Sequence, residues 1–281
     1  MAVRSVNIMD YKIDGKDILL CQADFDLDQT LDCGQAFRWE KTDENTYSGA
    51  FLNKELVISC ENGADVFKLH DTTEENFLSL WADYFDLSTD YSELKRRFSE
   101  DETLSKACRY ASGIRILRQD SWEALSSFII SQNNNIPRRK GIIGRLCEHC
   151  GGYPAWQELT EETEESLAYL RAGFRAKYLV DAVQKIRSGT IDLEKIRSMD
   201  IECARKLLQT IKGVGPKVAE CALLFGFYRT EAFPIDVWVK RVMANWYPNG
   251  LPECTRGYEG IAQQYPFHYI RTSEEAAASL K

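Results

Sequence analysis

The sequence lacks most features that mark membrane, disordered and metal-binding chains. No run of about 18 apolar residues occurs, so it predicts no membrane-spanning helix. Proline is rare, at 7 in 281 residues, and 44% of the residues are hydrophobic, a composition that favours a globular chain. Only three histidines are present, and the Cys-x-x-Cys pair of Cys147 and Cys150 has no second pair at ligand spacing, so we predict no metal site. The nine cysteines are expected to be free thiols.

Basic residues are outnumbered, and the net charge of −8 by itself disfavours nucleic acid as a partner. The acidity is unevenly distributed, because residues 1–100 hold 10 Lys and Arg against 21 Asp and Glu, whereas residues 101–281 hold 25 against 22. DNA binding requires a local basic face rather than a basic chain. A cluster of four basic residues could supply part of such a face or could be a solvated helix surface: Arg138, Arg139, Lys140 and Arg145.

Short strands and longer helices are expected in different parts of the chain. Apolar or alternating runs separated by turn residues predict strands at 17–22, 36–40, 47–52, 56–60 and 65–70. Helical spacing of apolar residues follows, first at 77–84 and then along most of the remaining chain. We predict an α+β fold, with an N-terminal antiparallel sheet domain at 1–100 packed on a helical body at 101–281.

Capping residues predict where several helices begin. Asp120 and Glu123 resemble a capping box that opens a helix at 121–132. Pro137 suits the first turn of the next helix. Thr160 is expected to begin a third helix and Gly173 to end it.

The most informative segment reads Gly-Val-Gly-Pro-Lys and ends at Lys217. Gly213 and Gly215 permit positive φ, and with Val214 they form a hairpin whose backbone N–H groups can seat a phosphate. Helix, hairpin and helix at about 201–226 make a helix-hairpin-helix motif. Burial and a helix dipole both favour a neutral amine, so Lys217 could be a nucleophile that forms a Schiff base. The alternative is a lysine that only contacts DNA phosphate.

An acidic residue, Asp236, follows 19 positions after Lys217 and precedes a helical pattern. Its simplest role is to cap that helix. Its second role would be a carboxylate that stabilises developing positive charge or relays a proton. The two roles are compatible, because a cap fixes the rotamer of a catalytic group.

These residues resemble the helix-hairpin-helix DNA glycosylases, with Lys217 and Asp236 at the lysine and aspartate of the lyase-competent members. The resemblance implies removal of 8-oxoguanine, preferably opposite cytosine, from double-stranded DNA, with nicking of the abasic strand. Four further segments, in one order along the chain, resemble the eukaryotic-type 8-oxoguanine DNA glycosylases: Cys-Gly-Gln-Ala-Phe-Arg-Trp at 33–39, Gln-Asn-Asn-Asn-Ile at 132–136, Gly-Phe-Arg-Ala-Lys-Tyr at 173–178 and Ala-Gln-Gln-Tyr-Pro-Phe at 262–267.

The resemblance also implies a pocket for a base flipped out of the duplex. Phe267 would stack on one face of the base, and Cys221 would lie against the other. Gln263 would pair with the Watson–Crick edge, since an amide both donates and accepts. The Gly34 carbonyl would accept the N7 hydrogen, which oxidised guanine has and guanine lacks. Lys217 and Cys221 stand four residues apart on one helix face and could share a proton as an ammonium–thiolate pair.

A second set of residues is implied on the side of the opposite base. Asn133 would fill the hole that the flipped base leaves, and Phe174 would wedge beside the orphan cytosine. Arg138 and Arg175 would donate hydrogen bonds to that cytosine, since a guanidinium carries several donors in one plane. The family has Tyr where Phe174 stands and His where Trp238 stands.

The implied mechanism has two stages. Lys217 would attack C1′ of the sugar as the damaged base leaves, with Asp236 stabilising the oxocarbenium-like charge, and the Schiff base would then permit β-elimination. No metal or organic cofactor is needed, although a monovalent cation could bind at the hairpin. We expect a monomer in a bacterial cytosol, associated with the nucleoid, because no transit segment or basic nuclear-type tail is seen. Two alternatives stay open: a monofunctional alkyl-base glycosylase and a non-catalytic helix-hairpin-helix DNA-binding module.

Overall fold

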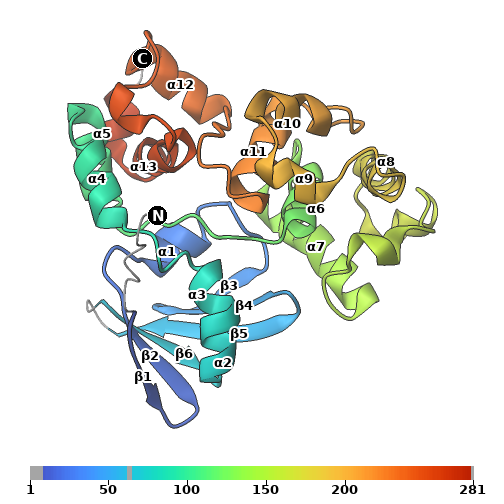
Figure 1. Cartoon of the computed structure of the whole chain (residues 1–281), viewed down its shortest axis with the longest axis horizontal. Coiled ribbons are helices and arrows are strands. Elements are labelled where there is room, and N and C mark those ends of the chain that lie inside the picture. The colour runs from blue at the N-terminus through green and yellow to red at the C-terminus, as the bar shows by residue number, and fades with distance from the viewer. Residues whose placement is uncertain (1–8, 62–64, 280–281) are drawn as a thin grey trace, which may run out of the picture.

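The computed structural model describes residues 9–61 and 65–279 and places a sheet at one end of a largely helical molecule (Figure 1). Residues 1–8, on which the expectation of no transit segment partly depended, lie outside the described part. The sheet is antiparallel with the strand order β1-β2-β6-β5-β4-β3, which confirms the α+β prediction. Its strands are β1 (Asp10–Asp14), β2 (Asp17–Cys21), β3 (Trp39–Asp43), β4 (Thr46–Phe51), β5 (Lys54–Cys60) and β6 (Val66–His70).

Alternation of buried side chains explains why five of these strands were predicted. Ile18 and Leu20 in β2, like Leu56 and Ile58 in β5, point into the core while their neighbours face outward. Strand β1 was not predicted; it is an edge strand whose side chains are mostly exposed. The strand predicted at 36–40 begins only at Trp39, since the residues before it turn toward the helical body.

A short helical segment covers the buried face of the sheet (Figure 1). It runs through α2 (Glu74–Asn76), the π-helical turn η1 (Phe77–Trp81) and α3 (Ala82–Tyr84), where a helix was predicted. Phe77 and Trp81 from this segment are buried among the strand residues and close the first of two hydrophobic cores.

The second core lies within the helical body, whose segments follow the sheet along the chain. Its helices, together with α1 near the sheet, are α1 (Leu27–Leu31), α4 (Tyr91–Phe98), α5 (Glu102–Tyr110), α6 (Ser121–Ser131), α7 (Ile136–Cys150), η2 (Trp156–Leu159), η3 (Ser166–Leu170), α8 (Arg175–Arg187), α9 (Leu193–Ser198), α10 (Ile201–Leu208), α11 (Pro216–Gly226), α12 (Val237–Asn245), η4 (Glu253–Thr255), α13 (Glu259–Thr272) and α14 (Glu274–Ser279).

Two predicted helix starts are confirmed and one predicted helix is wrong. The Asp120 carboxylate accepts the N–H groups that open α6, and Pro137 lies in the first turn of α7. No continuous helix joins Thr160 to Gly173, because Thr160 follows the end of η2 and only the short 3-10 segment η3 forms between the two residues. Thr160 donates its hydroxyl back to Gln157 O, and Gly173 (φ +61°) precedes α8 instead of ending a helix.

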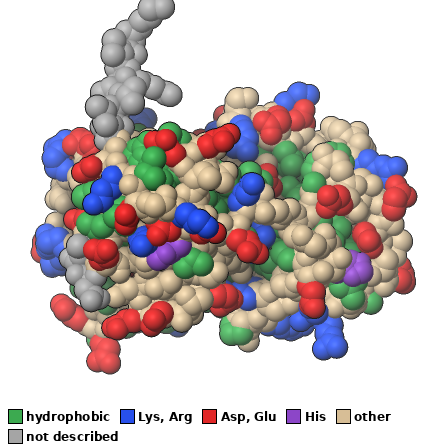
Figure 2. Space-filling view, turned by 90° about the horizontal axis from the view of Figure 1, so that it is seen from below, with side chains coloured by type: hydrophobic (Ala, Val, Ile, Leu, Met, Phe, Trp, Pro, Cys, Tyr) green, Lys and Arg blue, Asp and Glu red, His purple; other side chains and the backbone are tan. Residues whose placement is uncertain are grey.

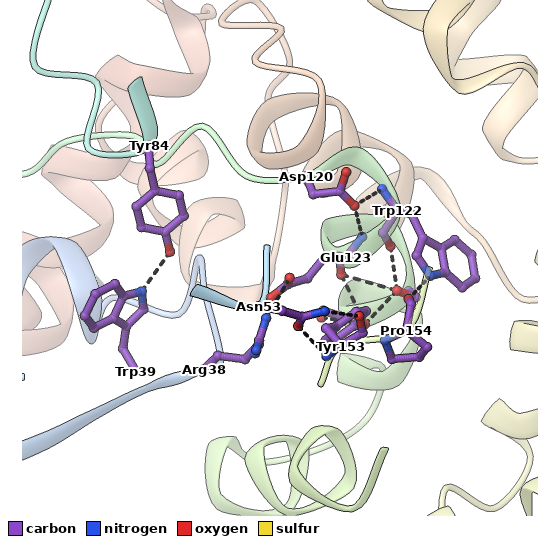
Figure 3. Close-up of polar contacts among 11 residues, drawn as sticks. Arg38, Trp39, Asn53, Tyr84, Asp120, Trp122, Glu123, Tyr153 and Pro154 are labelled. Atoms are coloured by element: carbon purple, nitrogen blue, oxygen red, sulfur yellow. Dashed lines mark hydrogen bonds and ion pairs between the residues drawn. The ribbon is translucent and has the colours of Figure 1, made fainter. Parts of the chain in front are cut away.

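Polar contacts join the sheet to the helical body (Figure 3). Arg38 lies 3.1 Å from the Glu123 carboxylate, so the capping-box glutamate pairs with the sheet domain. Asn53 accepts a hydrogen bond from the Tyr153 backbone N–H at 2.8 Å. Phe37 packs edge-on against Phe128 with ring centroids 5.7 Å apart, so the segment after α1 is fixed to α6.

The outer surface is polar and mixed in charge. Figure 2 shows one face, on which acidic and basic side chains are interspersed with small hydrophobic groups. No helix within the described ranges combines the length and the hydropathy that a membrane span requires.

Candidate active site

Of the two hairpin glycines between α10 and α11, only Gly213 takes a positive φ, whereas Gly215 is extended with φ −90°. Gly213 has φ +75°, and a Cβ at this position would lie 2.3 Å from the Tyr178 ring, so only glycine fits. Gly215 precedes α11 as its N-cap, and Pro216 occupies the first turn. These backbone N–H groups at a helix N-terminus are suited to a phosphate.

Lys217 lies in the first turn of α11 and is partly exposed. Its Nζ lies 5.5 Å from the centroid of the Phe128 ring on α6. One helical turn further, the Cys221 side chain is only 3% exposed. Burial raises the pKa of the Cys221 thiol, although the charge of Lys217 and a hydrogen bond to it act in the opposite direction. Burial therefore favours a neutral thiol over the ammonium–thiolate pair predicted from the sequence.

Asp236 caps α12, as predicted. Its Oδ1 accepts hydrogen bonds from the backbone N–H groups of Trp238 at 2.9 Å and Val239 at 2.8 Å. Both bonds fall on one oxygen, so the carboxylate is held in a fixed rotamer while Oδ2 takes no part in the cap.

Lys217 and Asp236 line one pocket of about 900 Å³, and most of the other predicted site residues line it too. The residues that line the pocket come from both halves of the chain, the first in sequence being Cys33 and the last Arg271. The predicted residues in its lining are Gly34, Asn133, Gly213, Gly215, Lys217, Cys221, Asp236, Gln263 and Phe267. The predicted residues outside its lining are Arg138, Phe174, Arg175 and Val214.

Gln263 on α13 lines this pocket and carries an unpaired acceptor. Its side chain is 6% exposed, and its Nε2 donates to the Pro234 carbonyl at 2.7 Å. The other amide atom, Oε1, is buried and has no hydrogen-bond partner within the described part of the chain. A buried oxygen without a donor is costly, so this atom is suited to accept from a ligand. Helix α13 continues across Pro266, next to Phe267.

Gly34 is placed by its buried neighbour Gln35. Gly34 has φ +91°, and a Cβ added there would meet no described atom within 4 Å, so its turn opens to empty space. The Gln35 amide donates to the carbonyls of Thr30 and Arg115 and accepts the Leu117 N–H, all at 2.8–2.9 Å. Sequence reasoning assigned no role to Gln35, although it holds the glycine at the pocket.

The residues predicted to meet the opposite base differ in how they are held. Arg138 is exposed, as is Phe174, which is 44% exposed. Arg175 is only 2% exposed, and its guanidinium donates to the carbonyls of Gln132, Asn133 and Ala172. In this structure Arg175 supports the turn at Asn133, whereas Arg138 faces outward.

Two arginines in the pocket lining were not assigned to the site from the sequence. The Arg271 guanidinium lies 4.9 Å from the centroid of the Phe267 ring. Arg139 donates to the Asn134 carbonyl at 2.6 Å, and its buried Nε has no partner among the described residues. Burial lowers the pKa of Arg139. The sequence feature that could have indicated Arg271 is its spacing of one helical turn from Phe267, which places both side chains on one helix face.

Within the described ranges, no three His, Cys, Asp or Glu side chains gather as a metal ion would require, either in this pocket or elsewhere.

Comparisons with known proteins agree with this geometry. Residues 17–125 match the family described as 8-oxoguanine DNA glycosylase, N-terminal domain, and residues 126–252 match the HhH-GPD superfamily of base excision DNA repair proteins. The chain is 31% identical to an N-glycosylase/DNA lyase of Saccharomyces cerevisiae, over 90% of this chain and 77% of the yeast protein. It is 30% identical to a probable N-glycosylase/DNA lyase of Methanothermobacter thermautotrophicus, over 89% and 95% of the two chains.

A solved structure is similar over nearly the whole length. It is an 8-oxoguanine glycosylase/lyase of Clostridium acetobutylicum in complex with double-stranded DNA containing cytosine opposite 8-oxoguanine. The identity is 35% with a TM-score of 0.86, covering 94% of this chain and 98% of the other. The predicted family is thus confirmed on both halves of the sequence and on the fold, and the chain belongs to the 8-oxoguanine DNA glycosylase/lyases of the helix-hairpin-helix superfamily.

Proposed function

We propose that this protein removes 8-oxoguanine opposite cytosine from duplex DNA through a Schiff base on Lys217, and that it then nicks the abasic strand. The observation that carries the proposal is that Lys217, Asp236 and Gln263 line one pocket, with Oε1 of Gln263 unpaired among the described residues. A nucleophile, a carboxylate and a base-reading acceptor are therefore within one ligand's reach of each other.

The chemistry starts at C1′ of the flipped nucleotide. The neutral Nζ of Lys217 forms a bond to C1′, and the bond from C1′ to N9 breaks as the base leaves with the electron pair and takes a proton. The carboxylate of Asp236 stabilises the positive charge that develops on the sugar. Loss of a proton from Nζ and opening of the sugar ring give the imine. Removal of a C2′ proton then expels the 3′ phosphate, and water releases the enzyme from the nicked product.

Recognition of the oxidised base depends on donors and acceptors in the pocket. Gln263 keeps its amide nitrogen on Pro234, so Oε1 is available for the N–H groups on the Watson–Crick edge of a guanine-type base. The Gly34 carbonyl would accept N7–H, which guanine does not have. One such contact discriminates by about 1–3 kcal/mol, the usual cost of a buried unpaired polar group.

Arg138 is the better candidate to read the opposite cytosine. Its guanidinium is exposed, whereas the donors of Arg175 already bind three backbone carbonyls. Arg175 would then act by shaping the turn that carries Asn133, and Phe174 by wedging beside the cytosine. No metal or organic cofactor is part of the proposal, because Lys217 itself supplies the nucleophile. A monomeric, cytoplasmic enzyme stays an expectation from the sequence.

Borohydride trapping tests the proposal. A duplex with 8-oxoguanine opposite cytosine is incubated with wild type, Lys217→Gln and Lys212→Gln, in the presence of borohydride. We expect a covalent protein–DNA adduct with wild type and with Lys212→Gln, because Lys212 lies in the same hairpin but outside the pocket lining. Lys217→Gln should bind duplex without giving an adduct or releasing base.

Other results would direct the assignment elsewhere. Base release without an adduct in wild type would identify a monofunctional glycosylase in which Asp236 works with water. Neither release nor adduct would indicate another lesion or a DNA-binding module. An adduct that persists in Lys217→Gln would remove Lys217 from the role of nucleophile.

A further inference from the structure

An arginine outside the predicted site is held against an aromatic side chain at the pocket. Trp238 follows Asp236 in the first turn of α12 and lines the pocket. One turn further along the same helix face, the Arg241 guanidinium lies 5.2 Å from the centroid of the indole ring. An indole face attracts a guanidinium by about 0.5–1 kcal/mol at an exposed site, so Trp238 limits the positions that Arg241 takes.

The charge of α12 is unusual for this acidic chain. Helix α12 (Val237–Asn245) contains no acidic residue, and its two basic residues, Lys240 and Arg241, are both exposed. Some exposed arginines pair with a carboxylate three residues earlier in the chain, as Arg96 does with Glu93 and Arg256 does with Glu253 at 2.7 Å. Within the described ranges no ion pair involves Arg241, so its charge is not compensated by the protein.

The position of Arg241 indicates which kind of anion it could bind. A nucleotide flipped into the pocket stays bonded to its strand, so phosphates of that strand must pass the pocket mouth. Arg241 is five residues from Asp236 on one helix, a rise of about 7.5 Å at 1.5 Å per residue. A phosphate next to the flipped nucleotide falls within the reach of an arginine side chain at that distance. A guanidinium also matches the geometry of phosphate oxygens through paired N–H donors.

We propose that Arg241, held against the Trp238 indole, binds a backbone phosphate of the damaged strand next to the flipped nucleotide. This inference rests on the proposed function, since it assumes that the pocket receives a nucleotide. The hairpin amides at Gly213 and Gly215 provide one phosphate seat at the pocket, and Arg241 provides a second. Two seats on one strand fix the sugar in front of Lys217 without reading the sequence.

Salt-dependent binding measures this contact. The full chain is titrated with a fluorescent duplex that carries a tetrahydrofuran abasic analogue opposite cytosine, and separately with the matching undamaged duplex. Each titration is repeated at salt concentrations from about 50 to about 300 mM NaCl, a range over which phosphate contacts change the affinity measurably. For Arg241→Ala we expect the slope of log Kd against log salt to fall by about 0.9, the value for one lost phosphate contact, on the abasic duplex. Arg241→Lys should keep the slope, because it keeps the charge.

Matched variants separate the contact from other effects. Arg256→Ala removes an exposed arginine outside the pocket lining and should leave the slope unchanged. Trp238→Leu frees Arg241 from the indole, and we expect weaker binding with a smaller loss of slope than in Arg241→Ala. A slope in Arg241→Ala equal to that of wild type would overturn the inference. An equal loss of slope on the undamaged duplex would also overturn it, since the phosphate would then not be one beside a flipped nucleotide.

Borohydride trapping of wild type on 8-oxoguanine duplex, run in parallel, keeps the two proposals distinct. Failure to trap would count against the Schiff base, while the salt slope on the abasic duplex would still decide the role of Arg241.

Discussion

The side-chain amide of Gln263 is oriented by the Pro234 carbonyl, which accepts a hydrogen bond from Nε2 at 2.7 Å. Pro234 belongs to the loop that leads to Asp236, so the amide proposed to read the base and the carboxylate proposed to act in catalysis are connected through one short segment. The bond leaves Oε1 as a buried acceptor with no partner in the described part of the chain.

Replacing Gln263 with Leu should therefore weaken the reading of the base. Loss of one buried acceptor contact costs about 1–3 kcal/mol, which corresponds to a drop of roughly 5- to 150-fold in kcat/KM on 8-oxoguanine duplex. Single-turnover rates of base release provide the measurement. Gln263→Met also lacks the acceptor while filling a similar volume, so it should lose about as much as Gln263→Leu; wild-type rates in both variants would contradict the acceptor role.

Replacing Asp236 with Asn should separate the helix cap from the chemistry. Asparagine caps a helix about as well as aspartate, so the melting temperature should change little. Base release should fall by roughly 10²- to 10⁴-fold, because the amide cannot stabilise positive charge or relay a proton. Asp200→Asn, which alters the cap of α10, is the matched control and should retain activity. Full activity in Asp236→Asn would assign this residue to capping alone.

Arg138 and Arg175 should give opposite results on substitution with Ala. Arg138→Ala should relax the preference for cytosine and leave unfolding within about 0.5 kcal/mol of wild type, as for an ordinary surface change. Arg175→Ala should lower the free energy of unfolding by about 1.5–3 kcal/mol, because it removes charged hydrogen bonds to buried carbonyls. Rates with each of the four opposite bases, together with urea unfolding, test both. An unchanged preference in Arg138→Ala would remove it from the role of reader.

Two hairpin glycines provide a matched pair. Gly213→Ala forces a Cβ to within 2.3 Å of the Tyr178 ring at φ +75°, so we expect a loss of more than about 1 kcal/mol of stability and weaker duplex binding. Gly215→Ala meets no described atom within 4 Å and has φ −90°, so its effect should be smaller. Thermal unfolding and duplex Kd values measure both. A Gly213→Ala variant with wild-type stability and duplex binding would show that the hairpin tolerates the side chain.

The buried carboxyl of Glu123, which contacts Arg38, predicts a pH dependence of stability. Burial raises the pKa of Glu123 to about 7, even though Arg38 acts in the opposite direction. Between the ordinary glutamate value and pH 7 the folded protein holds a proton that the unfolded chain has released. The free energy of unfolding should therefore fall as pH rises through this window, by at most about 1.4 kcal/mol per pH unit.

Urea unfolding from pH 4.5 to 8 of wild type and Glu123→Gln checks this dependence, a range set by the ordinary and raised pKa values. The variant should lose that part of the slope. The exposed Glu148→Gln is the control and should retain it. Identical slopes in wild type and Glu123→Gln would assign the dependence to other groups.

The sequence predicted the parts of the site that depend on local motifs. Gly213 and Gly215 predict the hairpin, and Asp236 predicts the cap, because each acts within a few residues of its own backbone. Contacts between distant segments were not predictable in this way. The bond from Gln263 to Pro234 and the buried donors of Arg175 depend on how helices pack, which periodicity does not specify.

The predicted helix from Thr160 to Gly173 failed for a local reason. Thr163 and Ser166 exchange side-chain to backbone hydrogen bonds and begin a short 3-10 segment there. Arg171 then takes φ +52°, which ends that segment before Gly173. Serine and threonine compete with helical hydrogen bonds in this manner, and the pattern of apolar residues does not reveal it.

The residues that line the pocket range from Cys33 to Arg271 along the chain, and this spread affects when the pocket forms during synthesis of the protein. A nascent chain that has reached only the end of α12 already carries Lys217 and Asp236 but lacks Gln263 and Phe267. Such a chain would carry the proposed nucleophile while the part of the pocket lining that α13 supplies is missing. Because α13 also packs into the core of the helical body, the pocket around Lys217 is complete only after α13 has been synthesised and packed.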